Sequence, residues 1–283
     1  MRDLALTLAV LGSLVTGCLS AAQSQLPSTR TSPSGAGATP SAKVSAVPTP
    51  DVMGQPTIEG PFAVGPDEHE LEIRCYGTGE PTIVFEAGND SGGIQSFPAA
   101  LVRPLAQTNR TCLYDRLGTG SSDLPTAERR TVDDVAADLQ ALLTAAEVAP
   151  PYLLVGQSGG GNIAVWYAAQ HGDDVAGLVL IDVGKDDPNT LAQEFPGEQA
   201  WGGPEHIDNV DAARMLANMN MPIGEFPVLV ITADQGQGDP DRPSGWRELS
   251  PRAREIVMHG GHDLHEEIPA DVAEEIRSIL DEL

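Results

Sequence analysis

Basic residues are scarce in this 283-residue sequence, which has 16 Lys and Arg against 41 Asp and Glu and a formal net charge of −25. A surface this acidic repels phosphate backbones and anionic headgroups, so we expect no nucleic-acid partner. The sequence also lacks a run of about 20 apolar residues, the length that crosses a bilayer. The apolar run from Leu4 to Val15 is too short, and no internal repeat is visible. A transmembrane protein is therefore disfavoured.

The first residues have the features of an export signal. Arg2 precedes the apolar run, and Val15-Thr16-Gly17-Cys18 ends it. This segment resembles a bacterial lipoprotein signal, in which small residues stand before a cysteine. The resemblance implies that residues 1–17 are removed and that Cys18 carries acyl chains, so that lipid anchors the exported protein to the extracytoplasmic face of the cell membrane. An ordinary cleaved signal with a chance cysteine is the alternative.

Residues 18–55 contain little that could form a core. After Cys18 this stretch is mostly Ser, Pro, Thr, Ala and Gly, without an aromatic residue. Such a segment buries too little apolar surface to offset the entropy of ordering it. We predict a disordered tether, followed by one domain over residues 56–283.

Two cysteines remain after Cys18, namely Cys75 and Cys112. An exported protein meets oxidising conditions, in which such a pair is a candidate disulfide. Pairing requires that the two segments be neighbours in the fold.

Short apolar runs alternate with helical patterns along the domain. The predicted strands are 71–75, 82–86, 111–114, 152–155, 178–181, 228–231 and 255–258, and the predicted helices are 131–148, 162–171 and 269–283. Thr131 and Asp134 form a capping-box pattern at the start of the first helix. Strands that alternate with helices form a mostly parallel sheet with both faces covered. The pattern predicts an α/β doubly wound domain whose functional loops follow the carboxyl ends of the strands.

The segment Gly156-Gln157-Ser158-Gly159-Gly160 directly follows one of these predicted strands. A nucleophilic serine needs a sharp strand-to-helix turn, where a base and a substrate carbonyl both reach it, and small flanking residues avoid clashes there. The backbone N–H of Gly159 can then point at a developing oxyanion.

With these features in order, the chain resembles the α/β-hydrolase family over nearly all of residues 57–283. Residues 86–89 (Glu-Ala-Gly-Asn) match the place of the family's oxyanion loop, and residues 114–121 (Tyr-Asp-Arg-Leu-Gly-Thr-Gly-Ser) are similar to its Tyr-Asp-Arg-x-Gly-x-Gly-x-Ser signature. Gly261-His262 resembles its histidine loop. The resemblance implies about eight strands, a small helical cap at about 183–225, and serine hydrolase chemistry that needs no cofactor.

Ser158 requires a base, for which His262 is the first candidate and His265 the rival. A carboxylate must also hold the imidazole in the correct tautomer. The family's register after the seventh strand gives Gly236 in place of an acid, with Asp234 nearby. The other known location, the end of the sixth strand, holds Asp182, so we predict Asp182 as the acid and Asp234 as the alternative. The weaker candidates are Asp186, Asp187 and Asp239.

The resemblance also implies an oxyanion hole formed by the backbone N–H groups of Asn89 and Gly159.

In the family's strand order, the Cys75 and Cys112 strands are neighbours, which implies a disulfide, with two buried thiols as the alternative. His259 and His262 are close enough in sequence to suggest a metal site. The two glycines between them preclude helical spacing, so we predict no metal. Several residues of the cap are candidates to line an acyl pocket or merely to pack the cap: Trp201, Met215, Leu216, Met219 and Met221.

The sequence therefore predicts an extracytoplasmic, monomeric serine hydrolase that cleaves an ester or related acyl bond of a small molecule. Its membrane contact would be the lipidated N-terminus. An aminopeptidase-like α/β-hydrolase is one alternative. A non-catalytic, ligand-binding lipoprotein on the same fold is the other, and the missing acid at position 236 favours it.

Overall fold

The structure is a computed structural model that describes residues 53–89, 92–236 and 244–283. The predicted signal, Cys18, most of the tether and Asp239 lie outside these residues. In the described part of the chain, no helix combines the length and apolar character needed to cross a membrane.

The described residues form one eight-stranded sheet in the order β1-β2-β4-β3-β5-β6-β7-β8. The strands are β1 (Ile58–Val64), β2 (His69–Tyr76), β3 (Thr82–Glu86), β4 (Thr111–Tyr114), β5 (Tyr152–Gln157), β6 (Val175–Ile181), β7 (Val228–Ala233) and β8 (Ala253–Met258). Strand β2 is antiparallel to both β1 and β4, whereas the pairs from β4 to β8 are parallel. The expected mostly parallel sheet of about eight strands is confirmed.

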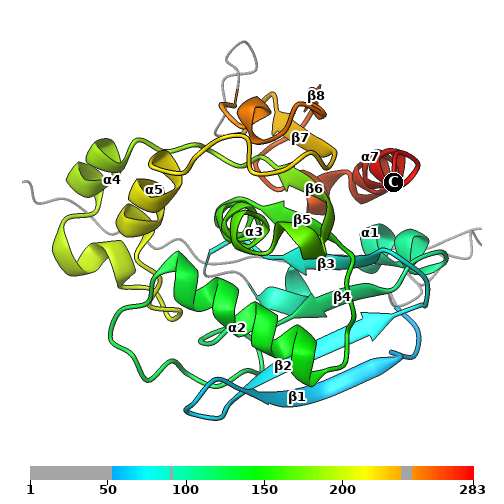
Figure 1. The fold of residues 1–283 in the computed structure, drawn as a ribbon, viewed down its shortest axis with the longest axis horizontal. Helices are drawn as coiled ribbons and strands as arrows, with labels where there is room; N and C mark the ends of the chain where they lie inside the picture. Colours follow the sequence, from blue (N-terminus) through cyan, green and yellow to red (C-terminus); the bar gives the residue numbers. More distant parts are fainter. Residues whose placement is uncertain (1–52, 90–91, 237–243) are drawn as a thin grey trace, which may run out of the picture. The chain divides into compact units, whose positions relative to one another are not determined.

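Helices cover both faces of this sheet (Figure 1). They are α1 (Ala99–Ala106), α2 (Val132–Ala145), α3 (Gly159–Gln170), α4 (Pro188–Glu194), α5 (Asn209–Ala217), α6 (Leu264–Glu267) and α7 (Pro269–Leu280), with short 3₁₀ helices at η1 (Gly93–Ser96), η2 (Gly172–Asp174), η3 (Gly197–Trp201) and η4 (Arg247–Leu249). Most buried side chains of α2 and α3 belong to one hydrophobic core, and those of α1 and α7 belong to another; Val132, Val135 and Ile163 form a smaller cluster with the cap. The sheet separates the two cores, as a doubly wound fold requires.

Helix α2 begins where the capping pattern predicted. The Thr131 side chain accepts a hydrogen bond from the backbone N–H of Asp134, and the Asp134 carboxylate accepts one from the backbone N–H of Thr131. These bonds satisfy two backbone donors at the helix start. Leu139, Leu142 and Leu143 on the buried face are fully covered.

Strand β1 and helix α1 were not predicted. Each contains a proline, a residue that disfavours strands and helix interiors: Pro61 in β1 and Pro104 in α1. Strand β1 lies at the edge of the sheet, where a proline is tolerated. Tertiary packing decides α1, since Leu101, Val102 and Leu105 are fully buried.

Cys75 and Cys112 face each other in the antiparallel pairing of β2 with β4 and form a disulfide. Both side chains are fully buried. The implied pairing is therefore present, and the two-thiol alternative is wrong.

The segment between β6 and β7 carries α4, η3 and α5, at the place expected for the cap. The loops that follow β3, β5, β6 and β8 leave the sheet at the same edge, because these strands are parallel. Candidate functional residues 87–89, 158, 182 and 259–262 therefore converge on one edge of the sheet.

Candidate active site

Ser158 lies at the sharp turn between β5 and α3, with φ 51° and ψ −129°. This is a costly conformation for a residue with a side chain. A Cβ on Gly156 would lie 2.5 Å from the Cα of Gly161, and one on Gly160 would lie 2.2 Å from the carbonyl oxygen of Ala87. Both positions must therefore be glycine, since backbone blocks any side chain. The turn holds the Ser158 hydroxyl at the cavity described below.

Ser158, His262 and Asp182 lie in one hydrogen-bonded chain. The Nε2 of His262 is 2.9 Å from Ser158 Oγ, and its Nδ1 is 2.6 Å from Asp182 Oδ2. A carboxylate only accepts hydrogen bonds, so Nδ1 carries the proton and Nε2 accepts from the serine hydroxyl. The hydrogen bond to Asp182 raises the pKa of His262 above its ordinary value, and partial burial opposes it.

Asp182 is held in place by the ends of two strands. It directly follows β6, has a positive φ of 46°, and is buried. Its Oδ1 accepts a hydrogen bond from the backbone N–H of Ala233 at the end of β7. A Cβ on Gly236 would lie 2.5 Å from Asp182 Oδ2, so the Asp182 carboxylate occupies the space beside position 236. This explains how the chain can lack an acid at 236.

Asp234, the alternative acid, faces a different histidine. Its carboxylate lies 2.8 Å from Nδ1 of His259 and accepts a hydrogen bond from the backbone N–H of Gly260. The bond to His259 lowers the pKa of Asp234. The His259 side chain is 80% exposed. The hydrogen bonds of Asp234 therefore go to the start of the loop that carries His262, and neither of them goes to His262 itself.

His265, the rival base, is buried in α6 and packs against Phe97, with ring centroids 5.5 Å apart and an angle of 56° between the ring planes. Burial lowers its pKa. It therefore packs behind the loop that carries His262.

The loop after β3 lies against the serine turn. The side chain of Asn89 sits beside the Cα of Gly159 and donates a hydrogen bond of 2.6 Å to Asn209 Oδ1 in α5. That amide is therefore engaged with the cap, and the backbone N–H groups of Asn89 and Gly159 remain the predicted oxyanion donors.

Sequence reasoning missed a buried ionic network beneath this loop. Arg116, which follows β4, pairs with Glu86 at the end of β3 and with Glu205 of the cap, and all three side chains are at most 3% exposed. Tyr114 donates a hydrogen bond to Glu86. Burial raises the pKa of Glu86 to about 7, against the opposing effects of Arg116 and Tyr114. The 114–121 signature contains the arginine, but no local pattern marks Glu205 as its partner.

The same signature also builds the loop after β4. The Asp115 carboxylate accepts hydrogen bonds from the backbone N–H groups of Ile94 and Ser121. The bond from Ile94 joins the segment after β3 to the loop after β4, and the bond from Ser121 closes the loop after β4 on itself.

A cavity of about 690 Å³ opens at Ser158, Asp182 and His262 between the sheet edge and the cap. Its lining combines apolar and polar side chains: Leu191, Phe195, Leu216, Trp246, Asn162, Gln199, Lys185 and Asp186. Asp187 also borders it but caps α4 through the backbone N–H of Thr190.

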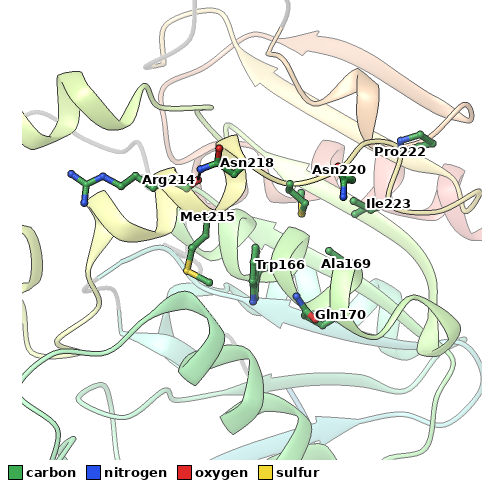
Figure 2. A pocket seen from close by; sticks show the side chains of 10 residues that line it. Trp166, Ala169, Gln170, Arg214, Met215, Asn218, Asn220, Pro222 and Ile223 are labelled. Atoms are coloured by element: carbon green, nitrogen blue, oxygen red, sulfur yellow. Dashed lines mark hydrogen bonds between the residues drawn. The ribbon is translucent and has the colours of Figure 1, made fainter.

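The predicted apolar pocket residues divide between different places. Only Leu216 lines the cavity at Ser158. Met215 and Met219 line a separate hollow of about 630 Å³ between α3 and the end of the cap (Figure 2). Trp201 stacks under the Arg129 guanidinium, and Met221 packs against the core. Of the two roles considered for the cap residues, pocket lining thus applies to Leu216, whereas Trp201, Met215, Met219 and Met221 lie away from the cavity at Ser158.

Across the described ranges, no group of three or more His, Cys, Asp or Glu side chains is arranged to hold a metal ion. His259 and His262 each pair with an aspartate instead.

A family model described as the α/β hydrolase fold matches residues 81–198. A curated relative, the uncharacterised protein YqjL of Bacillus subtilis (strain 168), is 26% identical over 208 residues, which cover 68% of this chain and 81% of the relative. The structure resembles an esterase from Thermogutta terrifontis (TM-score 0.63, 22% identity, 79% of this chain and 98% of the other). It also resembles an enol-lactonase from Burkholderia xenovorans LB400 (TM-score 0.59, 20% identity, 78% and 100%).

Proposed function

Since the chain has the α/β-hydrolase fold, we propose that it is a serine hydrolase that cleaves an ester or related acyl bond. The observation that carries the proposal is the hydrogen-bonded chain from Asp182 through His262 to Ser158. These three residues lie on separate loops, and the serine borders a cavity large enough for a small molecule.

In the proposed reaction, Ser158 Oγ attacks the substrate carbonyl as its proton passes to His262 Nε2. Asp182 stabilises the imidazolium through Nδ1–H. The backbone N–H groups of Asn89 and Gly159 stabilise the negative oxygen of the tetrahedral intermediate. The leaving alcohol takes the proton from Nε2, and an acyl-enzyme remains. Water, deprotonated by the same nitrogen, then releases the acid and restores the serine.

The cavity favours a neutral acyl substrate of modest size. Leu191, Phe195 and Leu216 offer apolar surface, while Gln199 and Asn162 offer hydrogen bonds. Two proteins of similar fold are named as an esterase and an enol-lactonase. An open-chain ester or a lactone is therefore the substrate class to screen first.

The site of action belongs to the same proposal. Val15-Thr16-Gly17-Cys18 supports lipid attachment at Cys18 and display on the outer side of the cell membrane. Incorporation of labelled palmitate into the wild-type protein, and its loss in Cys18→Ser, is the expected result. Incorporation that survives Cys18→Ser would contradict the anchor without touching the hydrolase proposal.

Labelling with a fluorophosphonate probe tests the chemistry. The wild-type protein should be labelled, Ser158→Ala should not, and Ser121→Ala, at an exposed serine in a neighbouring loop, should be labelled normally. A folded wild-type protein that takes no label would instead favour the ligand-binding alternative.

A further inference from the structure

Arg116 bridges the cap and the loop that carries Asn89, which also contacts the cap directly through the hydrogen bond from Asn89 to Asn209. The five N–H donors of Arg116 have five acceptors: two oxygens of Glu205, one of Glu86, and the carbonyls of Ala87 and Gly88. The bonds to the two carbonyls are 2.6 and 2.8 Å long. A guanidinium is the side chain that can reach acceptors on several sides from one plane. The arginine therefore fixes the path of the loop at residues 87 and 88.

The bond to Gly88 has a directional consequence. The Gly88 carbonyl and the Asn89 N–H belong to the same peptide unit, which is planar and trans, so the two groups point in opposite directions. Because Arg116 holds the carbonyl on the buried side, the N–H is turned away from Arg116. A Cβ on Gly88 would lie 3.4 Å from the Cβ of Ser158, so this peptide is next to the nucleophile.

Glu205 holds Arg116 from the cap. It is 2% exposed, accepts two hydrogen bonds from the guanidinium, and borders the cavity at Ser158. Burial of a charged pair is costly unless its geometry is good, and here the fork is fully satisfied. Removal of the carboxylate would take away two of the five acceptors of Arg116 and leave Glu86, Ala87 and Gly88 to hold it.

We propose that Arg116 and Glu205 are positioning residues for the oxyanion hole, through which the seating of the cap sets the direction of the Asn89 N–H. This inference rests on the proposed serine hydrolase function. Neither side chain needs to touch the substrate for this role. If the two residues have this role, changing either one should weaken the stabilisation of the substrate's carbonyl oxygen in the transition state.

The decisive variants in the full-length protein are Arg116→Lys and Glu205→Gln. Lysine keeps the charge but has three donors on one atom, so it cannot span both carbonyls and both carboxylates. The matched control is Arg130→Lys, since Arg130 is also buried, pairs with Asp138, and contacts the cap at the Glu205 carbonyl. Far-UV circular dichroism and thermal melting identify any variant that fails to fold, and Glu205→Gln, the more conservative change, then carries the test.

The activity readout compares a nitrophenyl ester with its thiono analogue, in which sulfur replaces the carbonyl oxygen. Sulfur accepts hydrogen bonds weakly, so an intact oxyanion hole favours the oxygen ester. We expect Arg116→Lys to lower kcat for the oxygen ester about 10- to 100-fold, below the 100- to 1000-fold cost of losing a donor outright. The preference for oxygen over sulfur should shrink in Arg116→Lys and Glu205→Gln and persist in Arg130→Lys. Equal losses on both substrates would overturn the inference.

A second readout does not depend on activity. In protein labelled with ¹⁵N-asparagine, the Asn89 amide resonance, assigned by its absence in Asn89→Ser, should move in Arg116→Lys and Glu205→Gln and stay in Arg130→Lys. A resonance that stays in all variants contradicts the inference. If the wild-type protein cleaves no ester yet the resonance moves, the proposed function fails and the positioning contact stands.

Discussion

At the scale of single residues, two positive φ angles direct the candidate site. Ser158 and Asp182 both adopt a conformation that non-glycine residues avoid, at a cost of about 1–3 kcal/mol each. Each directly follows a buried parallel strand, and the unusual turn aims its side chain at His262. Asp234 also follows a strand but faces His259. A difference in direction thus separates the two candidate acids.

Asp182→Asn should lower kcat on a nitrophenyl ester about 1000- to 10,000-fold, because an amide no longer holds the His262 tautomer that accepts the serine proton. Asp234→Asn should retain activity within about threefold, since its partner is the exposed His259. Steady-state kinetics on both purified variants checks this. The opposite ranking would make Asp234 the acid.

The raised pKa of His262 predicts a pH dependence. The histidine must be neutral to accept the serine proton, so kcat/KM falls as protonation increases at low pH. Because the hydrogen bond to Asp182 raises this pKa above the ordinary 6.5, the acid limb should have its midpoint above that value. An NMR titration should give a lower His262 pKa in Asp182→Asn. A wild-type midpoint at or below 6.5 would contradict the assignment.

At the scale of helices and strands, the sequence pattern predicted seven of the eight strands, including the mixed strands β2 and β8, but neither β1 nor α1. Strands β3 and β4 have the predicted bounds because every residue in them is buried, whereas β1 and α1 contain prolines that only their tertiary setting explains. The residues of the candidate site also differ in whether a local sequence pattern predicts them. Ser158 and His262 stand in local motifs, but the partnership of Arg116 with Glu205 joins residues 89 positions apart.

The disulfide joins β2 to β4 across a sequence separation of 37 residues. Closing a loop of this length restricts the unfolded chain, which stabilises the fold by about 4 kcal/mol in the chain-entropy account. The free energy of unfolding of the double variant Cys75→Ala/Cys112→Ala, measured by urea denaturation, should be lower than that of the wild-type protein by about this amount. The kcat of the double variant should be unchanged, because Cys112 lies near the amino end of β4, away from the site. Reductant should destabilise the wild-type protein and leave the double variant unaffected.

At the scale of the whole molecule, acidic charge dominates. The net charge is −25, and Asp3 and Asp51 are the only acidic residues before position 56. The domain therefore carries nearly all of the acidic residues. Among the described residues, Lys185 is the only Lys or Arg that lines the cavity, and it contacts the Gly245 carbonyl and the Trp246 ring. A field of one sign affects how charged substrates approach.

This field predicts opposite salt effects for substrates of opposite charge. Between about 10 mM and 1 M NaCl the screening length falls from about 30 to about 3 Å. Over this range kcat/KM should fall several-fold for a cationic ester and rise several-fold for an anionic one. A neutral ester of the same acyl chain is the control and should change less than about twofold. Parallel salt profiles for all three would show that the field does not steer substrate.

The ion pair between Arg116 and Glu205 limits how far the cap can be treated as an exchangeable module. A chimera that takes its cap from another hydrolase would inherit a new substrate pocket, yet would lose the carboxylate that pairs with Arg116. A buried arginine would then lack one of its two acidic partners. Grafted caps should work here only when they also carry an acidic residue at position 205, so the evolution of specificity in this chain is coupled to that one position.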